Sequence, residues 1–414
     1  MLTNHETCIG YSSGNRPVVT QDNAKHIFVC GTTGSGKTVA LSNYIKSGFD
    51  KDYPMLIVDG KGDIGEGSIL DIVNRLNPSK GTAGHRKVYV INMTMPNESD
   101  KYNPFTNATP TICKDMLINM TDWSEEHYKL NTERYLQRLV SMMDNSNIAL
   151  SFKNILAHMS MERFQELSGE LMQEKTITKD EHLQNVDIAK NSGKIAENAL
   201  ARFSTIAESD LNCIFDDEGI DIYTALKEKA IIVFILNPLI YPELTPLFGR
   251  LITIDSKKAI SKLFFENDSR VFFILDEINV YASTSLVDLV NKSRSANVTC
   301  ILATQSLSDL DFACGTAFKE QIIENCNNYI VLRQNSSVNS EHWSNILGTK
   351  ATMEVTYQLR QTGQGTSETG MGSAKRVREY IYHPDDIKAL KQGKGFFMSR
   401  DTGTHCKVTI QKPF

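Results

Sequence analysis

Short runs of apolar residues recur along the chain, and they are nearly continuous instead of alternating with polar residues. They are rich in Val, Ile and Phe and occupy residues 26–30, 55–59, 87–92, 230–236, 270–276, 298–305 and 329–333. Such runs predict strands that are buried on both faces of a sheet. Helical patterns separate several of them, as in residues 38–49 and 285–296. This alternation predicts an α/β fold with a mostly parallel central sheet.

Between residues 108 and 222 the strand pattern is absent, and apolar residues recur at helical spacing. They form three helical faces, which consist of Tyr135, Leu136, Leu139, Val140 and Met143, of Phe164, Leu167 and Leu171, and of Ile195, Ala199 and Phe203. We therefore predict an all-α insertion domain at 108–222, between two parts of the sheet domain, 1–107 and 223–414. Residues 161–220 contain 13 Asp/Glu and 6 Lys/Arg. This acidic stretch is either a solvated face or a surface that docks a protein.

The last part of the chain combines a polar loop pattern with a hairpin pattern. Residues 361–374, QTGQGTSETGMGSA, are rich in Gly, Ser and Thr and predict a flexible loop. A basic cluster follows, and residues 350–400 hold 9 Lys/Arg and 5 Asp/Glu. This region either lines a channel for nucleic acid or is a solvated loop. The segments 393–400 and 405–411 predict a terminal β-hairpin.

The segment GTTGSGKT fits the phosphate-binding pattern G-x-x-x-x-G-K-[ST] and lies between a strand pattern and a helix pattern. Its glycines let the backbone curl so that N–H groups point at phosphate oxygens. We expect Lys37 to reach the β- and γ-phosphates and Thr38 to hold Mg²⁺. The predicted nucleotide-binding residues are Gly31, Thr32, Thr33, Gly34, Ser35, Gly36, Lys37 and Thr38.

A carboxylate pair follows another apolar strand, in the segment RVFFILDEIN. Asp276 is expected to orient the Mg²⁺ shell, and Glu277 to polarise the water that attacks the γ-phosphate. Gln305 ends the strand VTCILATQ and is either a contact for the γ-phosphate or the attacking water, or an ordinary polar strand end. A third polar segment, with Asp59, Lys61 and Asp63, follows the strand 55–59 and is expected at the same sheet edge.

An arginine that stabilises transition-state charge is a further expectation for a hydrolysing site. Arg294 lies before the strand 298–305, a position from which it would serve a neighbouring subunit, and Arg250 and Arg333 are its rivals. A surface salt bridge is the alternative interpretation of Arg294.

Composition sets limits on these interpretations. The chain has 414 residues, 44 Lys/Arg and 49 Asp/Glu, so its net charge of -5 excludes a globally basic nucleic-acid binder. Its 8 cysteines form no C-x-x-C pair, which favours free thiols in a reducing compartment. The first residues lack a signal-peptide pattern, and we expect a cytoplasmic location.

Taken in order, IFVCGTTGSGKT, LIVDGKGD, FFILDEIN, ILATQSLSDL and ENCNNYIVLRQ resemble the conjugative coupling ATPases of type IV secretion, which belong to the FtsK–HerA group of P-loop motor proteins. The resemblance covers about residues 15–105 and 225–414. It implies a RecA-like ATP- and Mg²⁺-binding domain with an inserted all-α domain, in a hexameric ring with ATP at subunit interfaces. Arg294 would be the trans arginine finger and Gln305 the γ-phosphate sensor.

The same resemblance implies DNA as the polymer moved, a relaxase or accessory protein as partner, and a membrane secretion channel as destination. Relatives usually have N-terminal membrane helices, whereas this chain begins some 25 residues before its first predicted strand. We therefore expect either a soluble protein that docks on a separate membrane anchor, peripheral at the inner membrane face, or a trimmed chain. Two other functions remain open: a related hexameric motor for segregation, resection or packaging of DNA, and a nucleotide-gated receptor for secreted proteins.

Overall fold

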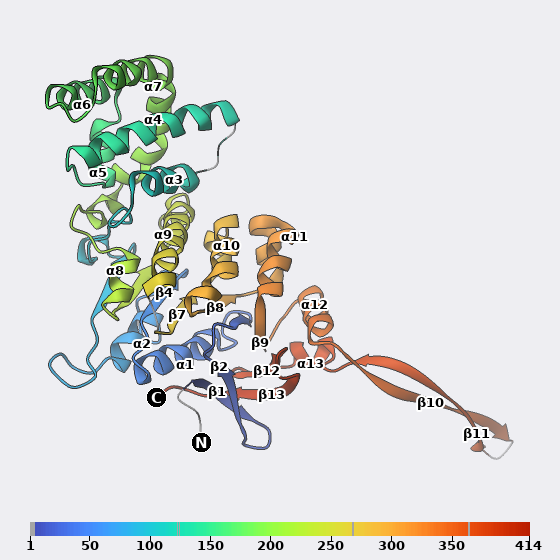
Figure 1. Ribbon diagram of the computed structural model, residues 1–414. Helices are drawn as coiled ribbons and strands as arrows, with labels where there is room; N and C mark the ends of the chain where they lie inside the picture. The colour runs from blue at the N-terminus through green and yellow to red at the C-terminus, as the bar shows by residue number, and fades with distance from the viewer. Residues whose placement is uncertain (1–4, 122, 124, 267–268, 363–364) are drawn as a thin grey trace.

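An 11-stranded sheet organises the protein, which we describe from a computed structural model (Figure 1). The structure describes residues 5–121, 123, 125–266, 269–362 and 365–414. Along the sheet the strand order is β2-β1-β13-β12-β9-β3-β8-β7-β4-β6-β5. The run from β9 to β5 is parallel throughout, and the strands beyond β9 pair antiparallel. The predicted α/β fold with a mostly parallel sheet is therefore confirmed.

The parallel strands coincide with the apolar runs of the sequence. They are β3 (His26–Cys30), β4 (Met55–Asp59), β5 (Val88–Asn92), β6 (Ile231–Ile235), β7 (Val271–Leu275), β8 (Val298–Thr304) and β9 (Cys326–Leu332). Alternate residues of β3 enter two separate hydrophobic cores, Ile27 and Val29 on one face and Phe28 and Cys30 on the other. Because both faces are covered, every position of such a strand favours an apolar side chain.

Helices cover both faces of this sheet. The core containing Ile27 includes residues of α1 (Lys37–Asp50) and α2 (Ile69–Leu76). The core containing Phe28 includes residues of α9, α10, α11 and α12, which span Leu244–Glu266, Thr284–Ser293, Leu307–Asn325 and Ser337–Leu347. Short connecting elements complete the sheet part: η1 (Pro96–Glu98), η3 (Ile278–Tyr281), η4 (Arg294–Ala296) and α13 (Pro384–Lys388).

A helical part lies between β5 and β6 and stands at one end of the molecule (Figure 1). Its helices are α3 (Pro110–Met120), α4 (Glu126–Asn145), α5 (Phe152–His158), α6 (Met161–Gln173) and α7 (Lys179–Ala207), and the chain returns through η2 (Asp210–Ile214) and α8 (Ile222–Lys227). The apolar faces predicted on α4 and α6 are buried. The proposed domain boundaries at 107/108 and 222/223 stay a prediction.

A buried lysine joins the two chain crossings between the sheet part and the helical part. Lys258 Nζ on α9 donates to the carbonyl oxygens of Pro104 at 2.7 Å and Thr106 at 2.6 Å on the outgoing chain. On the returning chain it donates to Asp221 Oδ2 at 2.8 Å, and it pairs with Asp255 Oδ1 at 3.0 Å. Burial raises the pKa of Asp255 to about 6, against the opposing charge of Lys258. One ammonium therefore holds both crossings against α9.

Two strands near the N-terminus were not predicted. They are β1 (Glu6–Ser12) and β2 (Pro17–Gln21), so strands precede β3 in a region that the apolar pattern left empty. β1 pairs with β13 (Thr404–Ile410), and β13 pairs with β12 (Lys394–Ser399). These strands extend the sheet at its antiparallel edge, where the incomplete burial of β1, β2 and β13 gives mixed polar and apolar sequences.

The predicted flexible loop over 361–374 is corrected by the structure. Apart from 363–364, which lie outside the described residues, it belongs to a long ribbon of β10 (Thr349–Thr362) and β11 (Gly365–Tyr380). The pairing register runs from Thr349↔Tyr380 to Thr362↔Gly365, and the ribbon projects away from the body (Figure 1). Backbone N–H and C=O groups of the two strands form the pairing, so strands can form here without aliphatic side chains. Within the described residues, no helix is long and apolar enough to cross a lipid bilayer.

We predict that Lys258→Met destabilises the protein strongly at pH 7. The side chains of Lys258 and Asp221 are 1% and 0% exposed, so the substitution leaves buried carboxylates without their cation, at a cost of about 3–5 kcal/mol. Urea unfolding measures the change, and the deficit should narrow as the pH falls and the carboxyls take up protons. The neighbouring Lys257→Met removes a pair of 32% and 51% exposed side chains and should change stability little. Equal effects of the two substitutions would contradict this role for Lys258.

Candidate functional site

The phosphate-binding segment connects the carboxyl end of β3 to the amino end of α1. Gly34 and Gly36 have φ angles of 72° and 112°, a region that favours glycine. A Cβ on Gly31 would lie 2.5 Å from Ser35 Oγ and 2.6 Å from Leu332 Cβ. The three glycines therefore permit a tight curl that no larger residue would adopt without displacement.

The amino end of α1 faces this curl without a side-chain cap. Its N-cap is Gly36, which has no side chain to accept a hydrogen bond from the first turn. The first N–H groups of a helix lack intrahelical partners and carry the positive end of its dipole. A 14-residue helix that begins in this way offers these groups to an anion.

The carboxylate pair lies at the end of β7, on the same sheet edge. Asp276 and Glu277 are 0% and 2% exposed, and Lys37 is 4% exposed. Lys37 Nζ lies 3.1 Å from Glu277 Oε1 and donates to the Gly31 carbonyl oxygen at 2.9 Å. The sequence-predicted lysine and glutamate are thus brought together across the intervening β8. Glu277 has a φ of 47°, which is unusual outside glycine and is a feature of functional sites.

Burial changes the acidity of this cluster. It raises the pKa of Glu277, as does the charge of Asp276, while Lys37 and Lys61 oppose the rise. Burial likewise raises the pKa of Asp59 to about 7, with a further contribution from Asp276. A carboxylate whose pKa is raised is a better proton acceptor from water than an exposed one.

Gln305 connects the two halves of the cluster. Its Nε2 donates to Glu277 Oε1 at 3.2 Å, and its Oε1 accepts from Thr33 Oγ1 at 3.1 Å. The strand that it follows, β8, lies between β3 and β7. A residue in this position touches both the phosphate-binding loop and the carboxylate that faces it.

The three candidate arginines lie in different places. Arg294 begins η4, is exposed, and precedes the amino end of β8, whereas Gln305 follows its carboxyl end. Seven residues of strand separate these ends by about 20 Å, so Arg294 is not part of the cluster in its own chain. Arg250 lies on α9. Arg333 lies beside the phosphate-binding loop, since its carbonyl oxygen accepts from Thr32 N at 3.0 Å.

A buried histidine supports the turn that bears Arg294. The ring of His26 is 3% exposed, with Nε2 2.9 Å from the Val290 carbonyl oxygen and Nδ1 accepting from Cys300 N at 3.1 Å. These partners select the neutral ring with its proton on Nε2. Burial lowers the pKa of His26 to about 4, and the charge of Arg294 adds to this effect.

Sequence reasoning missed or underrated several residues of the site. Lys61 Nζ pairs with Asp276 Oδ2 at 3.0 Å, a contact that the expected position of its segment at this sheet edge did not specify. Gln334 is 0% exposed, and its Nε2 donates to the Gln305 carbonyl oxygen at 3.4 Å. Gly393 N donates to the Ser35 carbonyl oxygen at 2.9 Å, so the C-terminal segment contacts the phosphate-binding loop. No sequence signal indicates the last two contacts.

The residues present fit a nucleoside triphosphate with a divalent cation. Ser35 Oγ and Glu277 Oε2 are buried, with no hydrogen-bond partner among the described residues. The hydroxyl of Thr38 and the carboxylate of Asp276 are hard oxygen donors of the kind that Mg²⁺ prefers. Lys61 Nζ lies 3.5 Å from Thr38 Oγ1 and 3.0 Å from Asp276 Oδ2, so one small cationic group already spans these two donors.

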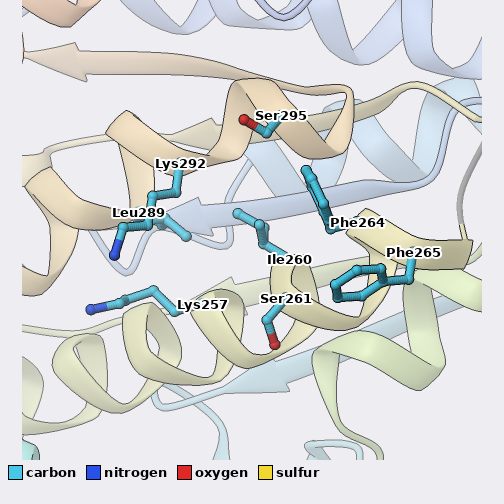
Figure 2. Close-up of a pocket in the computed structure, with 8 residues that line it drawn as sticks. All are labelled: Lys257, Ile260, Ser261, Phe264, Phe265, Leu289, Lys292 and Ser295. Carbon is cyan, nitrogen blue, oxygen red and sulfur yellow. The ribbon is translucent and has the colours of Figure 1, made fainter.

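A separate pocket opens between α9 and α10 (Figure 2) and shares no residue with this cluster. Figure 2 shows two lysine side chains reaching toward one end and two phenylalanine rings at the other. Its lining residues are Lys257, Ile260, Ser261, Phe264, Phe265, Leu289, Lys292 and Ser295. The pocket is apolar with a basic end and lacks the backbone curl of the phosphate-binding site.

Comparisons with known proteins find similar sequences and a shared fold. The sequence profile of a family described as the TraM recognition site of TraD and TraG matches residues 270–392. An uncharacterized protein of Mycoplasma pneumoniae is 31% identical over 138 residues, which are 33% of this chain and 92% of that protein.

Solved structures share the fold. The bacterial conjugative coupling protein TrwBdeltaN70 superposes with a TM-score of 0.67 at 17% identity, over 98% of this chain and 88% of that one. The plasmid coupling protein TrwB in complex with ADP and Mg²⁺ gives 0.64 at 17% identity, over 99% and 90%. VirB4 of Thermoanaerobacter pseudethanolicus gives 0.57 at 10% identity, over 99% and 98%.

We predict that His26 makes the protein less stable as the medium becomes acidic. Between pH 6.5 and about 4 the unfolded chain binds a proton that the folded chain excludes, so the free energy of unfolding falls by up to about 1.4 kcal/mol per pH unit. Urea midpoints at pH 7 and pH 5 measure this slope. His26→Gln removes the one proton whose binding differs between the two states, so it should reduce the slope by up to about 1.4 kcal/mol per pH unit. The exposed His342→Gln is the control and should leave the slope unchanged. A slope unaltered in His26→Gln would show that other groups cause the acid sensitivity.

Proposed function

We propose that this chain, which belongs to the type IV secretion coupling ATPases of the FtsK–HerA group, binds ATP with Mg²⁺ and hydrolyses the ATP. The observation that carries the proposal is the approach of Lys37 Nζ to Glu277 Oε1 at 3.1 Å, bridged to Thr33 by Gln305. A phosphate-binding loop and a buried carboxylate pair thus face each other across one strand. This is the arrangement that phosphoryl transfer to water requires.

Each residue of the cluster has a distinct proposed role. Lys37 binds the β- and γ-phosphates, and the N–H groups of residues 31–38 surround them. Thr38 and Asp276 hold Mg²⁺, which withdraws charge from the phosphate oxygens when it is bound. Glu277 accepts a proton from the attacking water, a role that its raised pKa favours. Gln305 senses the γ-phosphate because it contacts both Thr33 of the phosphate-binding loop and Glu277.

The proposed work of this ATPase is to move DNA toward a secretion channel. Residues 350–400 carry a net positive charge and include the projecting ribbon. This charge supports contacts with the phosphate backbone of a nucleic acid. A homo-hexameric ring is proposed because exposed Arg294 is far from the cluster of its own chain and would complete that of a neighbour. A relaxase or accessory protein would present the DNA, and a membrane partner would hold the ring at the inner membrane face.

The acidic helical part supports a second candidate function. Residues 161–220, with 13 Asp/Glu and 6 Lys/Arg, suit a docking surface for a protein and would repel DNA. A receptor for secreted proteins would use the same nucleotide site as a gate. A related motor for segregation, resection or packaging would share the ATP chemistry and differ in its partners.

We predict ATP turnover that rises when DNA is added. Phosphate release measured with no DNA, with single-stranded DNA and with double-stranded DNA, across protein concentration, reports both stimulation and assembly. Glu277→Gln should reduce turnover by about 10²–10⁴-fold with ATP still bound, because only the proton acceptor is lost. Lys37→Ala should abolish turnover.

The controls separate the candidate functions. Turnover in Lys37→Ala equal to that of the wild type would reject the site. Weak turnover that DNA leaves unchanged would favour the protein receptor over the DNA motor.

We predict that Arg294→Ala and Lys37→Ala subunits, each inactive alone, recover part of the activity when mixed. In a mixed ring, some sites receive an intact Lys37 from one subunit and an intact Arg294 from its neighbour. Turnover of the mixture against each single variant measures the recovery. Arg333→Ala mixed with Lys37→Ala is the matched comparison and should give no recovery. Arg333 lies beside the loop of its own chain, so each site of the mixture lacks one of the two residues. Absence of recovery with Arg294→Ala would remove Arg294 from the site.

A further inference from the structure

Lys61 places a second ammonium group in the nucleotide site. Its Nζ lies 3.0 Å from Asp276 Oδ2, 3.8 Å from Glu277 Oε1 and 3.5 Å from Thr38 Oγ1. These contacts put the charge between the hydroxyl at the start of α1 and the carboxylate pair at the end of β7. It is therefore positioned beside the groups proposed to hold the metal and the attacking water.

The backbone below Lys61 is firmly held. Lys61 N donates to Asp59 Oδ1 at 2.9 Å, which closes a tight turn directly after β4. A Cβ on Gly60 would lie 2.8 Å from Glu277 Cβ and 2.9 Å from the Asp276 carbonyl oxygen. Gly62 has a φ of 74°, and a Cβ there would lie 2.6 Å from the Leu236 carbonyl oxygen. Glycines on both sides of Lys61 thus let the turn lie against the carboxylate pair.

The Lys61 side chain is more accessible than that of Lys37. Its side chain is 36% exposed, whereas that of Lys37 is 4% exposed and is fixed between Gly31 and Glu277. A lysine side chain is cationic at pH 7. The site therefore contains one fixed ammonium and one that can turn toward a different anion.

We propose that Lys61 binds the terminal phosphate and makes the site distinguish a nucleoside triphosphate from a diphosphate. This inference rests on the proposed function and assigns a specificity to the same site. Thr38 and Asp276 would hold a divalent cation, whose charge would displace the Lys61 ammonium from Asp276 toward the terminal phosphate, the anion beside that position. Lys61 would then leave Asp276 to the metal and bind the phosphate through a charge-assisted hydrogen bond.

The strand order explains why the terminal phosphate is the target. The glycine curl follows β3, and Lys61 follows β4, with β8 and β7 between them. At about 4.8 Å between neighbouring strands, the backbone of Lys61 is about 14 Å from the curl. Its side chain therefore extends toward the loop from the far side of Glu277. A diphosphate would be held by the curl and Lys37 and would lack the group that Lys61 contacts.

The test compares nucleotide affinities and does not depend on turnover. A fluorescent non-hydrolysable ATP analogue and fluorescent ADP are titrated, both with Mg²⁺, into the wild type, Lys61→Met, Lys61→Arg and Lys46→Met. Lys61→Met should bind the analogue about tenfold more weakly and ADP within about twofold of the wild type. Lys61→Arg keeps the charge and should retain most of the affinity. Lys46 has a similarly exposed side chain, at 39%, in an ion pair on α1, and Lys46→Met should change neither affinity.

The outcomes separate this inference from the proposed function. Equal weakening of analogue and ADP in Lys61→Met, unchanged binding of both, or tighter binding of the analogue would each overturn the role of Lys61. In all three cases the wild type still binds nucleotide, so the proposed function stands. A wild type that binds neither nucleotide would overturn both proposals. ADP binding by Lys61→Met at the wild-type level also reports that the variant is folded.

Discussion

The contact between Lys37 and Glu277 requires two strands that are not neighbours to end at the same level of the sheet. β3 and β7 flank β8, and parallel pairing brings the carboxyl ends of all three to one edge. The loop after β3, the acidic pair after β7 and Gln305 after β8 therefore meet without any long-range adjustment. Helices on both faces bury these strands, and burial keeps the polar cluster out of bulk water, where its interactions would be weaker.

Much of this arrangement could be predicted from sequence because it depends on local patterns. Continuous apolar runs indicated the buried strands, and GTTGSGKT together with Asp276 and Glu277 indicated the nucleotide site. The order of strands across the sheet has no local signature. β4 lies next to β7 although β5, β6 and the helical part intervene in sequence, so the ion pair of Lys61 with Asp276 could not be derived from spacing. The same holds for Gly393, which reaches Ser35 from the far end of the chain.

The errors have a common physical origin. β1 and β2 lie at an edge of the sheet, so their burial is incomplete and their sequences mix polar with apolar residues. The segment 361–374 was interpreted by composition, which reports side-chain burial and not backbone pairing. Both mistakes concern strands outside the doubly covered part of the sheet. Arg294 shows a different limit, because it lies about 20 Å from the cluster of its own chain and its proposed role would require a second copy.

Lys258 brings together the two points at which the chain enters and leaves the helical part. Its single nitrogen is within 3 Å of Pro104 and Asp221, so the points where the chain departs and comes back are almost in contact. The bridges of Tyr102 to Phe215 and Ile220 reinforce this closeness. Everything between these points is a side branch on an otherwise continuous framework. Such a branch could be exchanged for another helical part that offers the same apolar surface to the sheet, with the phosphate-binding loop and the carboxylate pair unchanged.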